Sequence, residues 1–305
     1  SFNMNDNTDK TSLLKKVFKR ALIIFGVGLF LNWFPFYNKH VSDLRIFGVL
    51  QRIAMAFFFG SIIIIYVKEK WLMFVAICIL VFYYLLLIYG VDTGQLDLMT
   101  NLVRKLDLLI LGENHLYNGY TYEGNNIPFD PEGILSTLGS IGNVLFGYII
   151  SKKIKDYNEE SSKIKSAVLF GLLLVILGIL WNYFNCPINK PIWSGSYAML
   201  TSGLCSILFA IMIYIIDFKK LVKWSFPFKV FGMNALASYA LSGLVVKIMS
   251  IIRIGNENIF SMFYKNVTSA AFGLKLGSLV SAILYCFLIW SFAYILYKKK
   301  IFIKA

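Results

Sequence analysis

The sequence predicts an all-α polytopic membrane protein, and three observations lead to that class. First, 58% of the 305 residues are hydrophobic and 15% are charged, whereas a soluble domain is nearer to half apolar and a quarter charged. Second, the apolar residues gather in blocks of the length that a membrane-spanning helix needs, roughly 20 residues. Third, the blocks lack the alternation of apolar and polar residues that is typical of a membrane β-barrel. Helices are then the structures that satisfy the backbone in lipid.

Eight apolar blocks are predicted to span the membrane. They cover residues 21–37, 46–67, 71–90, 133–151, 166–184, 196–216, 227–249 and 276–297. Most of the connecting segments are short, and we see no soluble domain between them. Residues 1–305 are therefore interpreted as a single transmembrane domain, with a long loop at residues 91–132.

The basic residues are divided unevenly between the two ends of these predicted helices. If the segment before the first helix is cytoplasmic, the inner segments hold 20 of the 30 basic residues and the outer segments hold eight. An excess of Lys and Arg marks cytoplasmic loops, so both ends of the chain are predicted to be cytoplasmic. The net charge of +14 is thereby explained by topology, and no nucleic-acid partner is expected.

The composition offers little for a metal or redox centre. Cys78, Cys205 and Cys286 fall inside predicted helices, while Cys186 lies in an outer loop, which is not a disulfide or metal-ligand spacing. The only two histidines, at positions 40 and 115, cannot form a zinc site by themselves. No P-loop, dinucleotide-binding or zincin motif is present, so no metal is expected.

The long outer loop contains the stretch "LDLMTNLVRKLDLLILG", whose apolar residues recur at helical spacing. Such a segment can form a helix that lies flat on the membrane surface. The next stretch, "ENHLY", places His115 near carboxylates at the water boundary. A neutral imidazole there could transfer protons, although a lone loop histidine is more often simply solvated.

Polar side chains inside the predicted helices indicate a site, because lipid makes them costly. They are Asn32, Gln51, Arg52, Asn143, Asn182 and Asn234. Most of them fall toward the outer ends of their helices, which predicts a pocket that opens outward. The alternative is that each amide only joins two helices. Arg52 needs a carboxylate, a phosphate or water, and Asp130 or Glu132 is the expected protein partner.

The start of the fourth predicted helix can be interpreted in two ways. In Asp130-Pro131-Glu132, the first residue fits an N-cap, the second fits the first helical position and the third complements the helix dipole. These residues could instead line the outer pocket. Beyond them, Ser136, Ser140, Gly139 and Gly147 put small residues on the faces of the helix, which favours close packing.

Four blocks together resemble one family of membrane enzymes. They are "LRIFGVLQRIA" from Leu44, "ENHLY" with "FDPEGILSTLGSI" from Glu113 and Phe129, "PINKPIWSGSYAMLTSG" from Pro187, and "FGMNALASYALS" from Phe231. In order and spacing they resemble the transmembrane acetyltransferases related to heparan-α-glucosaminide N-acetyltransferase and their bacterial NagX-like or YeiB-like relatives. The resemblance covers most of the chain from about residue 20 onward.

The resemblance implies that acetyl passes from cytosolic acetyl-CoA to an amino sugar or sugar hydroxyl on the far side of the membrane. The family's catalytic histidine lies in a loop upstream of every residue in this sequence. We therefore expect an N-terminally truncated copy, inactive by itself, of a protein with about ten helices. The expected location is the bacterial cytoplasmic membrane, among membrane lipids, and a homodimer is possible.

The site residues follow from these arguments and from the resemblance. The expected catalytic group contains His115, Asp130 and Glu132, with His115 second to the upstream histidine. The expected substrate-binding residues are Arg45, Gln51, Arg52, Asn114, Lys190, Trp193, Ser194 and Tyr197, and Trp193 is expected to stack on a sugar. Arg20 and Asn234 are expected to contact acetyl-CoA. Two other functions suit a polytopic chain with buried polar groups: an amino-sugar transporter, and a non-catalytic membrane subunit.

Overall fold

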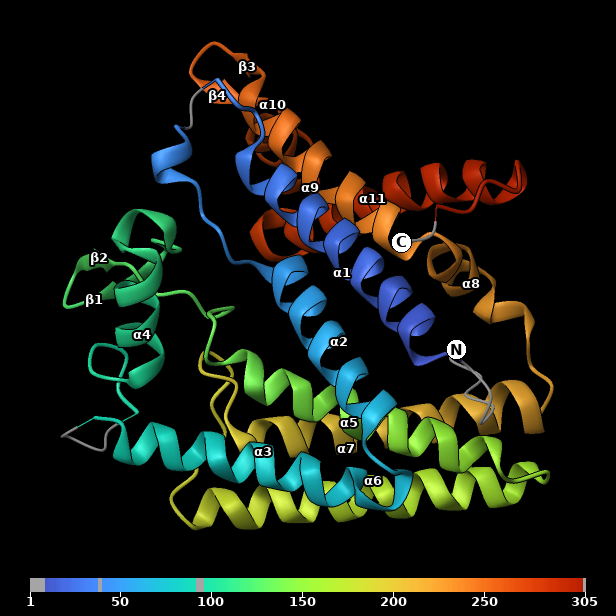
Figure 1. Ribbon diagram of the computed structural model, residues 1–305. Coiled ribbons are helices and arrows are strands. Elements are labelled where there is room, and N and C mark those ends of the chain that lie inside the picture. Colours follow the sequence, from blue (N-terminus) through green and yellow to red (C-terminus); the bar gives the residue numbers. More distant parts are fainter. Residues whose placement is uncertain (1–8, 38–39, 92–95, 304–305) are drawn as a thin grey trace. The chain divides into compact units, whose positions relative to one another are not determined.

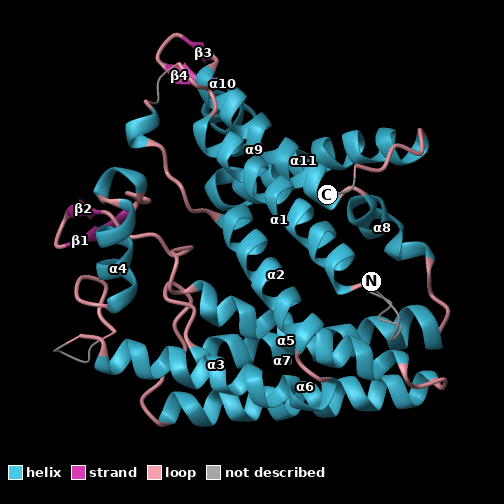
Figure 2. Ribbon diagram, viewed as in Figure 1, coloured by secondary structure: helices cyan, strands magenta, loops and turns pink. Residues whose placement is uncertain are grey.

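The computed structural model describes residues 9–37, 40–91 and 96–303. The described chain is mostly helical, with two short hairpins (Figure 2), which confirms the all-α class. By their contacts the described residues form two compact units, one within residues 9–32, 40–91 and 96–221 and the other within residues 33–37 and 222–303. The single domain that the sequence predicts stays a prediction.

The first unit contains most of the conspicuous polar residues. Its elements are α1 (Lys10–Trp33), η1 (Val41–Asp43), α2 (Val49–Tyr66), α3 (Glu69–Tyr89), α4 (Leu102–Leu111), η2 (Glu113–His115), β1 (Tyr120–Tyr122), β2 (Asn125–Ile127), α5 (Thr137–Lys155), α6 (Glu160–Tyr183), α7 (Gly195–Met212) and η3 (Ile213–Phe218). The strands β1 and β2 form an antiparallel hairpin. Figure 1 shows α3, α5, α6 and α7 running alongside one another, with α4 turned across the end of α3. The amphipathic stretch of the long outer loop is thus a helix, as predicted.

The core of this unit is apolar and packed between the helices. Leu80 of α3, Leu145 of α5, Leu174 of α6 and Ala198 of α7 are buried together in one hydrophobic cluster. Helices α6 and α7 approach closely at small residues, because a Cβ added at Gly203 would lie 2.6 Å from the carbonyl oxygen of Gly171. Small residues allow backbones to come this near inside a membrane.

The sequence predicts that the small residues of α5 allow close packing against neighbouring elements, and this holds for only some of them. A Cβ at Gly139 would lie 2.2 Å from the carbonyl oxygen of Trp193, so this position requires glycine. Around Gly147, by contrast, no described atom lies within 4 Å of an added Cβ. The prediction that Gly147 serves close packing is therefore wrong for the described residues, because no neighbouring element reaches that face of α5.

The second unit is built from η4 (Lys223–Ser225), α8 (Phe226–Met233), α9 (Ala235–Ile251), β3 (Arg253–Ile254), β4 (Glu257–Asn258), α10 (Ile259–Phe263), η5 (Tyr264–Ser269) and α11 (Ala270–Lys298). The sequence predicts one continuous helix over 227–249, and this is wrong. The segment is broken at Asn234, and its two parts are bent by 77°. The amide of Asn234 donates to the carbonyl of Ile301 at 3.1 Å and accepts from the amide of Ile303 at 2.8 Å, which holds the break in place.

Among the described residues, five helices are long and apolar enough to cross a membrane, or six if the bent pair around Asn234 is one span. All eight predicted blocks fall on helical segments. Helices α1 and α5 do not pass the same test, because α1 begins with a run of basic residues and α5 is rich in small and polar ones. The structure supports an all-α membrane protein and does not confirm the count of eight spans.

Candidate functional site

The charged groups of the first unit meet around a turn-rich segment, residues 130–136, that precedes α5. Of the two interpretations of Asp130-Pro131-Glu132, the one that makes Asp130 the N-cap of the helix is wrong, because α5 begins at Thr137. Asp130 does accept a backbone amide, that of Glu132 at 3.0 Å, and its carbonyl accepts the amide of Gly133 at 3.1 Å. These bonds make a turn, in which carboxylates and carbonyls face two arginines.

Arg45 holds both carboxylates of this segment. Its Nε and Nη2 donate to the two oxygens of Asp130, each at 2.8 Å, and its Nη2 also donates to Glu132 at 2.7 Å. The guanidinium lies 4.7 Å from the ring centroid of Tyr117. Burial alone would lower the pKa of Arg45, but the hydrogen bond and charge of Asp130, together with Glu132, outweigh it and raise that pKa. A two-pronged pair of this kind is strong and fixes orientation.

Arg52 lies on α2 and is buried. Its Nη2 donates to the carbonyl of Pro131 and to the hydroxyl of Ser136. The expected direct pairing with Asp130 or Glu132 is wrong, because Arg45 takes both carboxylates. They still lie near enough to interact with Arg52 electrostatically. The Nε of Arg52 is buried and has no hydrogen-bond partner in the described part of the chain.

Asp107 of α4 is a member of this cluster that the sequence analysis missed. It is fully buried, and its Oδ1 accepts the amide of Ile134 at 3.0 Å. Its Oδ2 is buried without a hydrogen-bond partner among the described residues. Burial raises the pKa of Asp107 from 3.8 to about 7, and the nearby charge of Asp130 adds to this, against the opposing effects of Ile134 and Arg52.

A signal for Asp107 was present in the sequence. Asp107 follows Val103 by one helical turn, so the two share a face of α4, and both are buried. A carboxylate on the apolar face of an amphipathic helix is unusual unless it meets a hydrogen-bond donor or a positive charge there. The surrounding segment was interpreted as a surface helix, which put its charges in water.

Trp193 closes the site on the side of α7. The guanidinium of Arg52 lies 4.7 Å from its ring, and the ring of Tyr197 meets it edge-on at 5.2 Å. The Nε1 of Trp193 donates to Asn143 at 2.7 Å. The amide of Asn143 in turn donates to Ala198, Thr201 and Ser202 of α7. The helix-joining alternative therefore holds for Asn143, and Arg52 stacks on the ring that was expected to receive a sugar.

His115 borders the cluster in η2. Its Nδ1 lies 2.7 Å from the carbonyl oxygen of Leu44. A carbonyl can only accept, so Nδ1 carries the proton and, in a neutral ring, Nε2 keeps its lone pair. The bond holds η2 against the segment that carries Arg45. The neighbouring Asn114 is exposed.

The other predicted binding residues have varied surroundings. Gln51 is buried against Gly28 of α1, and its Nε2 has no hydrogen-bond partner in the described ranges. Ser194 is buried as the N-cap of α7 and donates to the carbonyl of Pro187 at 2.8 Å. Lys190 is exposed in the loop before Trp193. Ser194 is thus fully used in folding the loop.

The two residues expected to contact acetyl-CoA lie in different units. Arg20 is exposed on α1, with its guanidinium 5.3 Å from the ring centroid of Phe57. Asn234 is fully buried, and both ends of its amide are bonded to the C-terminal segment. Neither arrangement tests a role in acetyl-CoA binding, which stays a prediction.

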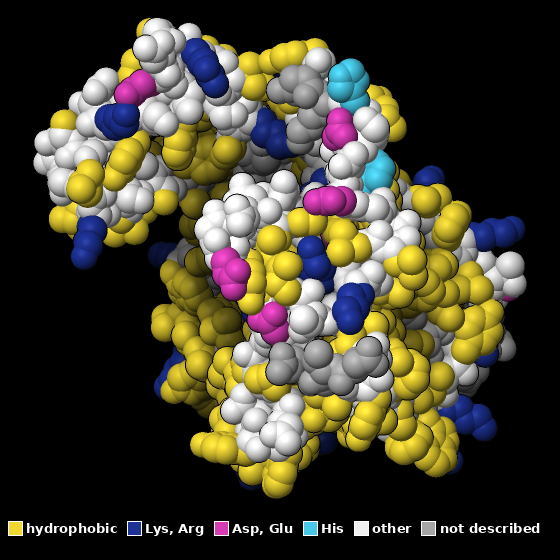
Figure 3. Space-filling model, turned by 90° about the vertical axis from the view of Figure 1, so that its left-hand side faces the viewer, with side chains coloured by type: hydrophobic (Ala, Val, Ile, Leu, Met, Phe, Trp, Pro, Cys, Tyr) yellow, Lys and Arg dark blue, Asp and Glu magenta, His cyan; other side chains and the backbone are white. Residues whose placement is uncertain are grey.

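Figure 3 looks at the side of the molecule on which α4 and the β1–β2 hairpin lie. Acidic and basic side chains gather on this face of the first unit, among hydrophobic ones. Below the surface the cluster consists of two arginines and three carboxyl groups, those of Asp107, Asp130 and Glu132. Such a set can bind a polar ligand through both charges and hold its orientation.

The fold and this cluster define a class: a polytopic helical membrane protein with a built polar site at the ends of its helices. No protein-family model matches the chain. Over 208 residues, it is 29% identical to the heparan-alpha-glucosaminide N-acetyltransferase of Mus musculus, an alignment that covers 65% of this chain and 29% of the relative. The Homo sapiens protein of the same name is 29% identical over 210 residues, with the same coverage.

These matches confirm the resemblance to heparan-α-glucosaminide N-acetyltransferases at the level of a distant relationship. The alignment spans 29% of the length of these curated relatives. The relationship therefore supports a membrane acetyltransferase-like chain, and it does not by itself assign an activity to the residues of the cluster.

Proposed function

We propose that this chain is part of a membrane enzyme that transfers acetyl from acetyl-CoA on the cytosolic side to an amino sugar or sugar hydroxyl on the other side. The observation that carries the proposal is the cluster of Arg45, Arg52, Asp107, Asp130 and Glu132, in a chain related to heparan-alpha-glucosaminide N-acetyltransferases. The location that goes with it is the bacterial cytoplasmic membrane, and a homodimer stays a prediction.

The cluster suits the acceptor side of this reaction. Asp130 is fully buried, and both of its oxygens are engaged by Arg45, so its role is to position the arginine. Glu132 is 19% exposed and contacts Arg45 through one oxygen, Oε2. Its carboxylate is the group best placed to meet the ammonium or hydroxyl of a sugar. The hydrogen bond from Nδ1 of His115 to Leu44 leaves Nε2 as an acceptor, so this residue can take up a proton from the sugar.

The chemistry is an acyl transfer. The acceptor nitrogen or oxygen attacks the thioester carbonyl, a new bond to the acetyl carbon forms, and the bond from that carbon to sulfur breaks. The acceptor gives its proton to a base, and the coenzyme A thiolate leaves and takes up a proton. The buried guanidinium of Arg52, with an unused Nε–H, suits the negative charge that develops on the carbonyl oxygen.

The proposed topology has eight spans and both ends in the cytoplasm. The charge cluster precedes α5, while Lys152, Lys153, Lys155, Lys163 and Lys165 surround the turn after it. With a rise of about 1.5 Å per residue, the 19 residues of α5 separate the two sets by about 28 Å. The hydrocarbon core of a bilayer is about 30 Å thick. Lysines inside and the cluster outside therefore agree with the positive-inside rule.

The test uses sealed membrane vesicles that contain the complete natural protein. Labelled acetyl-CoA is supplied on the cytosolic face and glucosamine on the opposite face, and labelled N-acetylglucosamine is measured. Product is expected to depend on both additions and to fall at least tenfold in Glu132→Gln. Arg104→Gln is the control for a lost polar contact, because Arg104 on α4 donates to the backbone carbonyls of Met99 and Pro128 and to no side chain of the cluster. Glucosamine uptake without acetyl-CoA, and no acetylated product, would instead indicate a transporter.

A further inference from the structure

A groove lies along α6 near its first turns, at the end of α5 opposite to the charge cluster. We call it the Lys165 groove. Its polar lining consists of Lys153 in the last turn of α5, Tyr157 after that helix, and Ser162, Lys165 and Ser166 on α6. The volume of the groove is about 320 Å³. This is large enough for a headgroup and part of a chain, since ligand sites start near roughly 300 Å³.

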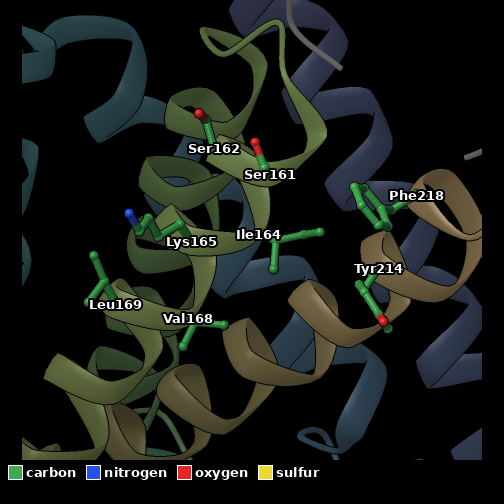
Figure 4. A pocket seen from close by; sticks show the side chains of 8 residues that line it. All are labelled: Ser161, Ser162, Ile164, Lys165, Val168, Leu169, Tyr214 and Phe218. Carbon is green, nitrogen blue, oxygen red and sulfur yellow. The ribbon is translucent and has the colours of Figure 1, made fainter.

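A second cavity, of about 530 Å³, lies on the other side of α6 and shares Ser162, Lys165 and Leu169 with the first. Figure 4 shows it: Lys165 and Leu169 point to one side of α6, while Tyr214 and Phe218 approach from η3 on the other. Lys165 therefore stands on the ridge between two hollows, with space on both sides of its helix.

The polar end of the Lys165 groove is suited to a phosphate. Lys153 and Lys165 are exposed and form no ion pair among the described residues, whereas the nearby Lys163 pairs with Glu160 at 3.0 Å. Ser166 is only 7% exposed, yet its hydroxyl has no hydrogen-bond partner in the part of the chain that is described. A buried hydroxyl is rarely left unbonded, and this one lines the groove beside two ammonium groups.

The other end of the groove is suited to an acyl chain. Leu169 and Leu173 are 62% and 50% exposed along α6, with the buried Phe170 at the floor between them. These residues lie in a helix that is long and apolar enough to cross a membrane. The groove thus passes from ammonium and hydroxyl groups to hydrocarbon within about three turns of one helix. A single ligand that follows this order has an anionic head and an apolar tail.

We propose that the Lys165 groove binds an anionic glycerophospholipid, with its phosphate between Lys153, Lys165 and Ser166 and one acyl chain along Leu169 and Leu173. Basic pockets between helices at the membrane surface recognise such headgroups. Acetyl-CoA also carries phosphates but has no long hydrocarbon chain to cover the leucines. The inference rests on the membrane fold and is independent of acetyl transfer.

The test measures lipid retained by the purified full-length protein. Dioleoylphosphatidylglycerol or dioleoylphosphatidylcholine is added in detergent micelles, and bound lipid is counted by native mass spectrometry. Retention of phosphatidylglycerol is expected to exceed that of phosphatidylcholine and to fall about tenfold or more in Lys153→Gln/Lys165→Gln, since each surface lysine contributes substantially to binding an anionic lipid. The matched control is Lys152→Gln/Lys155→Gln, which removes the same charge from the nearby last turn of α5, outside the groove lining.

Two further measurements test the proposal: lipid retention by a variant at Ser166, and competition by other phosphate compounds. Ser166→Val keeps the charges and places methyl groups at the phosphate position, so a loss of retention with unchanged thermal stability is expected. Acetyl-CoA or inorganic phosphate is added as competitor, and neither is expected to displace the lipid. Equal losses in the two lysine pairs, equal retention of the two lipids, or displacement by acetyl-CoA would each overturn the proposal.

Discussion

Arg45 and Arg52 form hydrogen bonds to different groups of segment 130–136. Arg45, at the end of the loop, takes both carboxylates, and Arg52, inside α2, takes a carbonyl and a hydroxyl and stacks on Trp193. An arginine costs roughly 2.5–3.5 kcal/mol at the centre of a membrane helix on insertion scales, and Arg52 lies in the first turn of α2, nearer to water. A lysine could supply the charge, but it could not stack and bridge two acceptors from one plane.

At this residue we expect Arg52→Lys to insert and fold normally but to lose about 10- to 100-fold of acetyl transfer, because each hydrogen bond from a charged group contributes about 1.5–3 kcal/mol. Arg52→Gln should insert at least as well and be as inactive. The measurement is acetyl transfer from labelled acetyl-CoA in membranes, normalised to folded protein. Near-normal transfer by Arg52→Gln would place the site elsewhere, and Arg104→Gln provides the control for loss of an arginine.

The raised pKa of Asp107 predicts that the stability of the protein depends on pH. Burial raises its pKa from 3.8 to about 7, so the folded protein holds this proton more tightly than the unfolded chain does. The stability that the neutral carboxyl contributes is present in full below about pH 4 and is lost as the pH rises through about 7. The melting temperature of the wild type in detergent should therefore fall relative to that of Asp107→Asn between these values. Parallel melting curves across this range would mean that Asp107 is ionised throughout.

At the scale of an element, the turn before α5 depends on a glycine. A Cβ at Gly133 would lie 1.8 Å from the Oδ2 of Asp107, so the segment and α4 can pack this closely only without a side chain. Helix α5 then begins after the turn and not within it. This arrangement fixes the three carboxyl groups relative to the two arginines.

We expect Gly133→Ala to destabilise the protein by about 1–3 kcal/mol, the usual effect of forcing atoms into a packed site. Asp107→Ala removes the clashing carboxylate, so the double variant should be more stable than the sum of the two single effects predicts. Thermal melting in detergent measures all three variants. Gly147→Ala is the control, because its Cβ would have no described atom within 4 Å. A fully additive double variant would show that the two residues do not meet.

The sequence alone predicts the helical class and four of the five residues of the charge cluster, but not the contacts between them. Arg45, Arg52, Asp130 and Glu132 stood out because charge in an apolar sequence is conspicuous. Which arginine holds which acceptor depends on contacts between residues 79 and 85 positions apart in the chain, and no local pattern encodes them. Asp107 was missed because its helix has an amphipathic sequence that also suits a membrane surface. The break at Asn234 depends on bonds to residues 301 and 303, which helical periodicity cannot indicate.

At the scale of the whole molecule, the topology hypothesis places Asn118 and Asn158 on opposite sides of the membrane. Asn118 lies in the loop beside the charge cluster, and Asn158 lies in the lysine-rich turn between α5 and α6. Both residues are exposed in the structure, so a cysteine at either position can react with a maleimide once the reagent reaches it. The positive-inside rule puts the turn in the cytoplasm.

In intact cells, a membrane-impermeant maleimide is therefore expected to label Asn118→Cys and to leave Asn158→Cys unlabelled until the membrane is opened. The four native cysteines, at positions 78, 186, 205 and 286, are free and are first replaced by serine or alanine. Lysis should make the two positions react equally, which excludes local shielding as the cause of a difference. Equal labelling in intact cells would end the eight-span topology, and labelling of Asn158→Cys alone would invert it and move the proposed acceptor site to the cytosol.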